Sequence, residues 1–236
     1  MTLNAAHARG EGLHQSTVSD DRVRENLDAM AEIATREEID VLGLQEIDGD
    51  SQWNGAFDHV EYLAESTGAG WWVRGGHARF LWLDYGTAIL GNPALVSSET
   101  VKFKTFGPGF KKGFTVSTVI LDEQEVDIVS LHLDPILGAR RKRQANQVID
   151  HLSENDRPRI IMGDFNVEYD EDNPIATMAD ALDLEVYEPD NDDLATFEDR
   201  RLDWILVSRA FQIEDYYVVP DEVSDHRPVV ARLSAP

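Results

Sequence analysis

The sequence contains no cysteine, which excludes disulfide bonds and thiolate metal ligands. It also lacks any apolar run that approaches the ~20 residues needed to cross a bilayer. Its first residues show neither the basic stretch nor the apolar segment of a secretory signal peptide. These absences favour a cytoplasmic protein that does not bind membranes.

Lysine is scarce, with five lysines in a chain of 236 residues whose formal net charge is −24. An acid-rich, lysine-poor surface holds water and cations, and it indicates either a salt-loving source or an ordinary acidic enzyme. The same charge repels nucleic acids in dilute buffer. At about 1 M salt the Debye length is only ~3 Å, so that repulsion is screened. We therefore expect no extensive nucleic-acid-binding surface. The charge does not exclude a small phosphodiester or a nucleic-acid end as the substrate.

Hydrophobic residues make up 42% of the chain, enough for a substantial core. The length suits one domain spanning residues 1–236. Helical apolar spacing alternates along the chain with short apolar runs that are typical of buried strands. Predicted helices cover 21–36, 58–66 and 140–152, and predicted strands cover 41–44, 87–90, 116–121, 126–131, 159–162, 204–207 and 229–233. This alternation predicts an α/β domain.

Polar residues come directly before or after several of the predicted strands. Gln45-Glu46 follow one strand, His132 ends another, and Gly163-Asp164-Phe165-Asn166 follow a third. Ser224-Asp225-His226 lie just before the last strand. Buried polar groups are costly unless they are bonded or used, and loops at strand ends carry sites in α/β proteins. We therefore expect these residues to meet in one functional site.

Together with Asn4, Gly86-Thr87-Ala88-Ile89-Leu90 and Asp203-Trp204-Ile205, these motifs resemble the endonuclease/exonuclease/phosphatase superfamily in both identity and order. That superfamily includes DNase I-like nucleases, abasic-site endonucleases, neutral sphingomyelinases and inositol polyphosphate 5-phosphatases. The motifs run from residue 4 to residue 228, nearly the whole chain. The resemblance implies a four-layer αββα sandwich of two packed mixed β-sheets, with the site at one end of the sheets.

The resemblance also implies metal-dependent hydrolysis of a phosphoester substrate. We favour a phosphodiester, as in a nuclease or a small-phosphodiester hydrolase. The first alternative is a phosphomonoesterase, or a sphingomyelinase-like or inositol-phosphatase-like hydrolase on the same scaffold. The second is a non-catalytic binding module, which predicts the loss of at least one core site residue, and none is missing. We expect a monomer.

Hard cations such as Mg²⁺ or Mn²⁺ neutralise phosphoryl oxygens and prefer carboxylate ligands. Glu46 is the predicted metal ligand, and Asp225 is a second candidate. Asp164 is expected to orient or deprotonate the attacking water. The amides of Asn4 and Asn166 are expected to fix Asp164 and the phosphoryl oxygens.

Two histidines complete the predicted catalytic group. His226 is expected to contact the phosphate as an imidazolium, and Asp203 resembles the family residue that pairs with this ring and raises its pKa. His132 is the second family histidine, which has a carboxylate partner in DNase I-like relatives. No clear equivalent is present near Gly86, although Asp84 is close in sequence, so general-acid catalysis by His132 stays open.

The loop after Asn4 departs from the nuclease pattern. Ala6 stands where nuclease relatives often carry Asp or Arg, so a second N-terminal metal ligand is not supported. His7, Arg9 and His14 in this loop either contact substrate or lie in solvent.

Three further residues are candidate substrate contacts. Lys112 and Arg140 belong to the densest basic runs, and they either hold phosphates that flank the scissile bond or form solvated surface charge. Trp53, in the segment after Glu46, either stacks on substrate or packs its own loop.

If the acidic composition is an adaptation to salt, melting temperature and phosphoesterase activity should both rise as KCl is increased to about 2 M, because salt screens the repulsion among surface carboxylates. Differential scanning fluorimetry and an activity assay across the same salt series measure this. Maximal stability and activity in dilute buffer would contradict the salt-loving interpretation.

Overall fold

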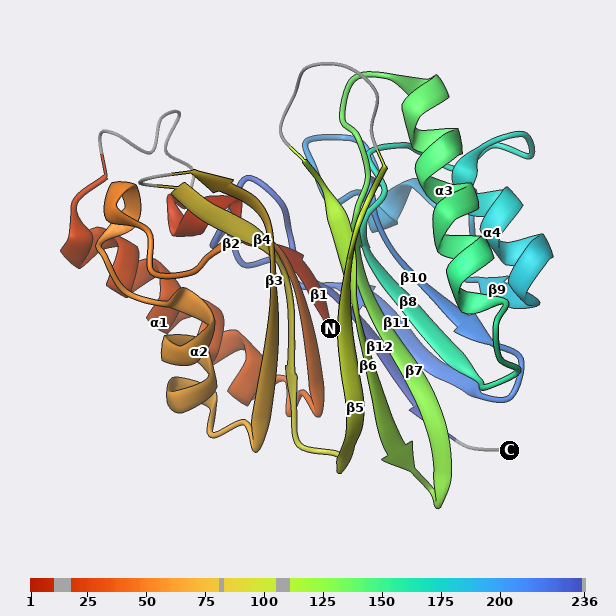
Figure 1. The fold of residues 1–236 in the computed structure, drawn as a ribbon, viewed down its shortest axis with the longest axis horizontal. Coiled ribbons are helices and arrows are strands. Elements are labelled where there is room, and N and C mark those ends of the chain that lie inside the picture. The colour runs from red at the N-terminus through yellow and green to blue at the C-terminus, as the bar shows by residue number, and fades with distance from the viewer. Residues whose placement is uncertain (11–17, 81–82, 105–110, 235–236) are drawn as a thin grey trace.

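The computed structural model describes residues 1–10, 18–80, 83–104 and 111–234, which form two six-stranded mixed sheets and four α-helices. Figure 1 shows the two sheets packed face to face, with α1 and α2 on the outer face of one sheet and α3 and α4 on the outer face of the other. The four-layer αββα sandwich predicted from the sequence is thus confirmed.

The first sheet has the strand order β11-β12-β1-β2-β4-β3, and the second has the order β5-β6-β7-β8-β10-β9. The strands are β1 (Thr2–Asn4), β2 (Val41–Asp48), β3 (Trp71–Phe80), β4 (Leu83–Gly91), β5 (Leu95–Lys102), β6 (Gly113–Leu121), β7 (Gln124–His132), β8 (Arg159–Asp164), β9 (Leu184–Val186), β10 (Asp203–Ser208), β11 (Gln212–Val218) and β12 (Val229–Ser234). The helices are α1 (Asp20–Arg36), α2 (His59–Thr67), α3 (Gly138–Leu152) and α4 (Pro174–Leu182). Short 3-10 turns are η1 (Ala6–Ala8), η3 (Gln52–Asn54) and η4 (Asp192–Leu194).

Three apolar clusters hold the layers together. One packs α1 and α2 onto the first sheet, where Leu27 meets Leu42 and its neighbours. A second packs α3 and α4 onto the other sheet around Trp204. The third lies between the sheets and includes Ile89 and Ile128. Each layer buries one apolar face or stripe, which is the pattern that the alternating sequence predicts.

Hydrogen bonds join the sheets next to this third cluster. Gln45 Nε2 donates to Ser130 Oγ over 2.9 Å, and Ser130 Oγ donates to the carbonyl of Leu44 over 2.9 Å. Thr87 Oγ1 lies 2.9 Å from Thr115 Oγ1 on the facing strand. All five residues are buried, so these bonds fix how the two sheets align at the level where the polar motifs begin.

The predicted strand 41–44 ends too early. β2 continues to Asp48, and its register with β4 shifts between Gln45 and Ile47. Glu46 is the extra residue, with a φ of 47°. A bulge of this kind re-aims a side chain without ending the strand, so Glu46 projects from within β2 and not from a loop after it. The predicted helices 21–36, 58–66 and 140–152 are confirmed within a few residues as α1, α2 and α3.

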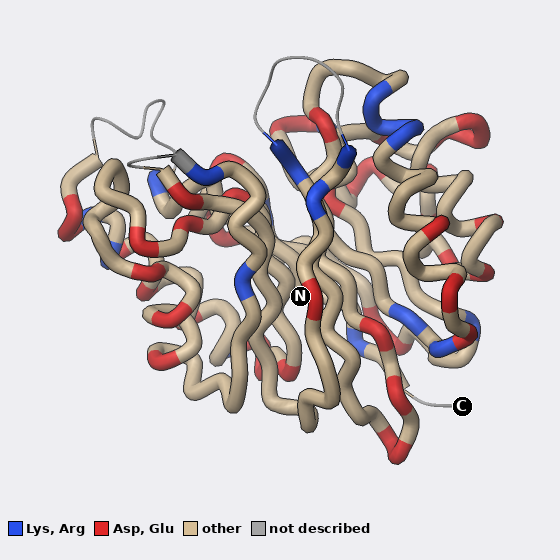
Figure 2. The backbone as a smooth tube through the Cα atoms, in the orientation of Figure 1, with Lys and Arg blue, Asp and Glu red and all other residues tan. Residues whose placement is uncertain are grey.

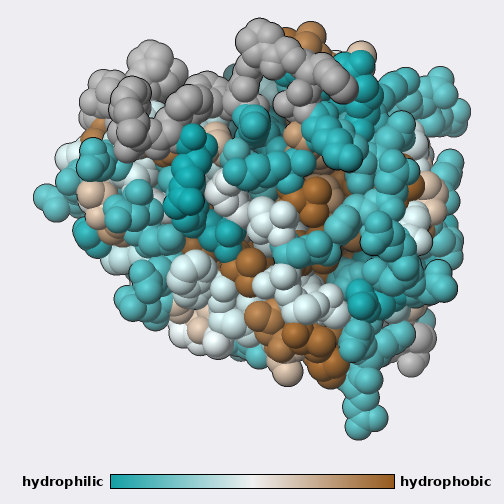
Figure 3. Space-filling model, in the orientation of Figure 1, coloured by the Kyte–Doolittle hydropathy of each residue, from teal (hydrophilic) through white to brown (hydrophobic). Residues whose placement is uncertain are grey.

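In Figure 3 most of the visible face is hydrophilic, and hydrophobic side chains show in its centre and along its lower part. Exposed large apolar residues include Leu95 and Val96 on β5 and Ile120 on β6. Among the described residues, no helix combines the length and the apolarity that a bilayer span requires.

Gly163 sits on β8 between β7 and β10, opposite Leu131 on one side and Trp204 on the other. Its φ is +147°, and a Cβ there would lie 2.0 Å from the carbonyl oxygen of Leu131. Only glycine therefore allows β7 and β8 to approach so closely, and this approach brings His132 and Asp164 level with each other.

Gly163→Ala should destabilise the protein by about 3 kcal/mol or more, because an overpacked core and a backbone conformation disfavoured for alanine add together. The shift of the urea unfolding midpoint measures this. Gly70→Ala is the matched control, since its Cβ would meet nothing closer than 3.7 Å. Equal midpoints for the two variants would contradict the packing argument.

Candidate active site

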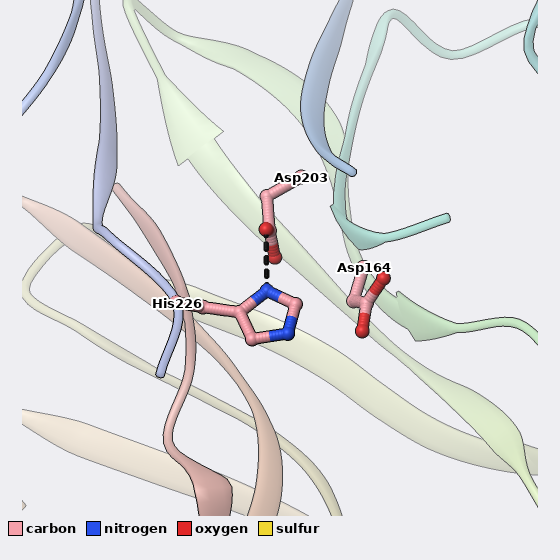
Figure 4. Close-up of side chains that lie close together, drawn as sticks. All are labelled: Asp164, Asp203 and His226. Carbon is pink, nitrogen blue, oxygen red and sulfur yellow. Dashed lines mark hydrogen bonds and ion pairs between the residues drawn. The ribbon is translucent and has the colours of Figure 1, made fainter. Parts of the chain in front are cut away.

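Two carboxylates face each other at the end of the second sheet. Asp164 on β8 and Asp203 on β10 are direct partners across the antiparallel pair. Candidate ligand atoms of Asp164, Asp203 and His226 lie within 4.8 Å of one another, and all three residues are buried. Figure 4 shows the His226 ring between the two carboxylates, with one nitrogen bonded to Asp203 and the other on the side of Asp164. The sequence placed these residues in separate motifs, and the fold brings them together.

His226 is held as a cation by Asp203. His226 Nδ1 lies 2.7 Å from Asp203 Oδ2, and Thr196 Oγ1 donates to the same oxygen over 2.7 Å. Burial acts to lower the pKa of His226, but the charge and hydrogen bond of Asp203 outweigh it, and the charge of Asp164 adds to them. The result is a pKa of about 10, so the ring is an imidazolium at neutral pH.

The pKa of Asp164 is raised as well, which for a carboxyl group favours the neutral form. Burial and the charge of Asp203 raise its pKa to about 7, against the lowering influence of His226. Asn4 Nδ2 donates to Asp164 Oδ2 over 3.0 Å, and the backbone N–H of Asn166 donates to Oδ1 over 2.8 Å. A carboxylate with a pKa near neutrality can both accept and release a proton, which suits a general base.

The two asparagines are themselves held in place. Asn4 Oδ1 accepts from the backbone N–H of Ala6 over 3.0 Å, and the Asn4 carbonyl accepts from Ser224 Oγ over 2.7 Å. Asn166 has a φ of 54°, and its Nδ2 donates to the carbonyl of Leu133 over 3.2 Å. Asn4 thus fixes the carboxylate of Asp164 directly, whereas the side chain of Asn166 is engaged with the loop after β7.

Glu46 projects from the β2 bulge toward three nitrogen groups. Its Oε1 lies 3.8 Å from His132 Nε2 and 4.0 Å from Lys112 Nζ, and its Oε2 lies 3.6 Å from His7 Nε2. The Glu46 side chain is one quarter exposed, so its carboxylate is open to a ligand that enters from solvent.

His132 contacts Lys112 instead of a carboxylate partner on β4. Lys112 Nζ contacts His132 Nε2, and that nitrogen lies 3.4 Å from Asp164 Oδ2. Burial, Lys112 and His226 together lower the pKa of His132 well below its ordinary value. Asp84, the sequence neighbour considered as a partner, is bonded to Arg74 instead. This lowered pKa favours the neutral form of His132, and a catalytic role for this residue stays a prediction.

The remaining predicted contacts divide into two groups. Arg9 is bonded to Asp225, and Arg140 Nη1 donates to Asp134 Oδ2 over 2.7 Å, so both guanidinium groups are engaged within the protein. Trp53 is 37% exposed and packs edge-on against the ring of His7. His14 lies outside the described residues. The structure therefore brings His7, Lys112 and Trp53 to the site, while Arg140 stabilises the loop after His132.

Three contributors were missed by the sequence analysis. Asp48 is fully buried and lies 3.4 Å from His7, and Thr196 is bonded to Asp203. Asp134 accepts from the backbone of Ile136 and Leu137 and thereby shapes the loop. Asp48 carried a weak signal, because it is an acidic residue that follows Glu46 by two positions. Thr196 carried none.

The lysines lie on one side of the site although the chain is acidic. Figure 2 shows Lys and Arg at the upper ends of β5 and β6 and at the start of α3, while the other Lys and Arg positions and the Asp and Glu positions are spread over the molecule. All five lysines fall in these segments, at 102, 104, 111, 112 and 142. Lys142 and Arg143 are exposed, so positive charge flanks one side of the site.

The oxygen donors at the site suit a hard divalent cation. The Glu46 carboxylate is partly open to solvent, and Asp164 is buried. Asp203 Oδ1 is buried and has no hydrogen-bond partner. Buried oxygen acceptors that lack donors are the groups that a cation or a protonated ligand satisfies. The residues present therefore fit Mg²⁺ or Mn²⁺.

A model of the endonuclease/exonuclease/phosphatase family matches residues 1–226 of this chain. The chain belongs to this family. Its members are hydrolases that act on phosphoesters and are typically dependent on divalent metal ions. No curated protein matches the sequence significantly.

Solved structures share the fold along nearly the whole chain. A family member from Bacteroides vulgatus has a TM-score of 0.78 at 16% identity, covering 100% of this chain and 97% of that one. The mannosyl-6-phosphatase of Bacteroides thetaiotaomicron has a TM-score of 0.76 at 18% identity, covering 99% and 98%. Humanized D. rerio TDP2 has a TM-score of 0.75 at 15% identity, covering 99% and 97%. At these identities the likeness shows the fold.

Asp203→Asn should lower the pKa of His226 from its wild-type value of about 10, because burial is then opposed only by the charges of Asp164 and Asp225. The imidazolium of the variant should therefore lose its proton at a lower pH than that of the wild type. A pH titration of imidazole ¹⁵N shifts measures this. Thr196→Val is the control, since it removes one hydrogen bond to Asp203 but leaves the charge, and its effect should be smaller. An unchanged His226 pKa in Asp203→Asn would contradict the assignment.

Proposed function

We propose that this protein is a divalent-metal-dependent phosphoesterase that hydrolyses a phosphodiester. The observation that carries the proposal is that Asn4, Glu46, Asp164, Asp203 and His226 converge on one end of the sandwich, where both Asp164 and His226 have raised pKa values. A carboxyl group whose pKa lies near neutrality can serve as a base, and a histidine that stays protonated can serve as an acid.

Glu46 would hold Mg²⁺ or Mn²⁺, which would supply positive charge for the phosphoryl oxygens of the substrate. Lys112 Nζ lies 4.0 Å from Glu46 Oε1 and would supply a second positive charge for the phosphate. Asp225 remains a second candidate ligand whose carboxylate is already paired with Arg9.

Asp164 orients the attacking water and accepts its proton. Asn4 keeps the Asp164 carboxylate in one orientation through the bond to Oδ2. A base fixed by a neighbouring amide retains its geometry during the reaction, which lowers the cost of reaching the transition state.

His226 stabilises the charge that develops on the phosphoryl group. Its Nδ1 is occupied by Asp203, so the proton on Nε2 is free to be donated to a phosphoryl or leaving-group oxygen. A preorganised cation in a buried site gives more stabilisation than one in water.

A phosphomonoester is the second candidate substrate. The likeness to a mannosyl-6-phosphatase motivates it, although that likeness establishes only the fold. The lysines and arginines beside the site favour a diester whose neighbouring groups carry further negative charge. A non-catalytic binding role is disfavoured because each predicted core residue is present.

Hydrolysis of bis-p-nitrophenyl phosphate with Mg²⁺ or Mn²⁺ should fall by about 10²-fold or more in Glu46→Gln and in His226→Ala, since each removes charge stabilisation at the phosphate. EDTA should abolish activity. A panel measured alongside should cover p-nitrophenyl phosphate, mannose 6-phosphate, plasmid and abasic DNA, RNA, sphingomyelin and inositol phosphates, at low and high salt.

His151→Ala is the matched control, because this histidine pairs with Glu99 on the outer side of the second sheet. It should retain wild-type activity. Full activity in both Glu46→Gln and His226→Ala would show that the chemistry lies elsewhere. Faster hydrolysis of monoesters than of diesters would favour the second candidate.

A further inference from the structure

His7 sits on a backbone that is locked in an unfavourable conformation. Ala6, His7 and Ala8 have φ values of 44°, 58° and 55°, and all three are buried. Left-handed conformation is disfavoured in each of these residues because of its Cβ. A run of three such residues therefore persists only because the surroundings hold it there.

Three asparagine side chains hold this turn. Asn4 Oδ1 accepts from the N–H of Ala6 over 3.0 Å, Asn54 Nδ2 donates to the His7 carbonyl over 2.7 Å, and Asn26 Nδ2 donates to the Ala8 carbonyl over 2.8 Å. They come from three different parts of the chain. Such support from separate elements is expected where the position of one side chain matters to function.

The His7 side chain points at two carboxylates. The His7 ring lies edge-on against Trp53 and Tyr85, with centroid distances of 5.0 Å and 4.7 Å. Its Nε2 lies 3.6 Å from Glu46 Oε2, and its Nδ1 lies 3.4 Å from Asp48 Oδ2. Nδ1 is buried and makes no hydrogen bond. The aromatic contacts fix the plane of the ring and leave both nitrogens directed at oxygen.

These distances are longer than the hydrogen bonds of an imidazolium to carboxylates, which run about 2.7–2.9 Å. A spacing of 3.6 Å is close to that of two donors that share one cation with bonds of about 2.1 Å. A histidine that ligates a metal commonly gives its other nitrogen to a carboxylate, the position that Asp48 occupies here. His132 is less suited, because Lys112 contacts its Nε2.

We propose that His7 Nε2 is a ligand of the same metal ion as Glu46, with Asp48 as the carboxylate that orients the ring. Imidazole nitrogen favours Mn²⁺, Co²⁺ and Zn²⁺ over Mg²⁺. The site therefore takes a first-row transition metal in preference to magnesium. This inference rests on the proposed function, because it concerns the metal that Glu46 holds.

Electron spin echo envelope modulation of bound Mn²⁺ tests the proposal without an activity assay. The wild type should show ¹⁴N coupling from one histidine, and uniform ¹⁵N-histidine labelling should change the modulation accordingly. His7→Gln should remove the coupling and weaken Mn²⁺ binding by roughly 10- to 100-fold, with a smaller effect on Mg²⁺. His132→Gln and the remote His151→Gln should retain the coupling.

The outcomes separate this inference from the proposed function. Mn²⁺ binding that Glu46→Gln abolishes, but that shows no nitrogen coupling in the wild type, overturns the His7 ligand and leaves the phosphoesterase proposal intact. Coupling that disappears in His132→Gln and persists in His7→Gln overturns it as well. The labelled wild-type chain decides for or against a histidine ligand even where His7→Gln fails to fold. If the wild type binds neither Mn²⁺ nor Mg²⁺, the proposed function fails together with this inference.

Discussion

The arrangement of the site depends on one constraint, the two facing carboxylates of Asp164 and Asp203. Strand pairing places them directly opposite each other, in a buried region where like charges repel strongly. The arrangement is tolerable only with compensation, which His226 provides as a cation and Asn4 and Thr196 provide as hydrogen-bond donors. The pKa of His226 is raised because Asp203 outweighs burial, whereas the pKa of Asp164 is raised because burial and the charge of Asp203 outweigh the lowering influence of His226 and Asn4. The cation and the hydrogen-bond donors that the proposed chemistry uses are thus the same groups that stabilise the buried carboxylate pair.

Unusual backbone conformations position other residues of the site. Glu46 and Asn166 have positive φ, His7 lies in a run of three such residues, and Gly163 has a φ that only glycine adopts readily. Each conformation is unfavourable for the local chain and is maintained by tertiary contacts. These residues lie at the end of the sandwich that holds the site, where function and stability are expected to conflict, although further residues with positive φ, such as Glu38 and Asp122, lie elsewhere in the fold.

The sequence predicts the fold class and the central strands well, because their apolar runs and terminal motifs are local features. It does not predict that β2 extends past Glu46, because a bulge depends on the pairing with β4. The contacts of Asn4 with Asp164 and of Asp203 with His226 were expected from the family resemblance, but contacts of residues outside the motifs were not. The bond of Arg140 to Asp134 shows why: the basic run suggested a phosphate site, but one of its members is needed to hold a loop. Ordered motifs specify which residues converge, whereas their partners depend on the three-dimensional packing.

The charge distribution bears on how substrate is bound. A net charge of −24 opposes the approach of any polyanion, and the basic side chains beside the site act over short distances only. If the protein works at high salt, long-range steering is weaker still. Under the proposed function, binding energy would then come from contacts inside the site: the metal ion that Glu46 would hold, the side chain of Lys112 and the imidazolium of His226. Such contacts would engage one phosphate and its immediate neighbours. The charge distribution therefore favours a small phosphoester or a chain end over an extended stretch of nucleic acid.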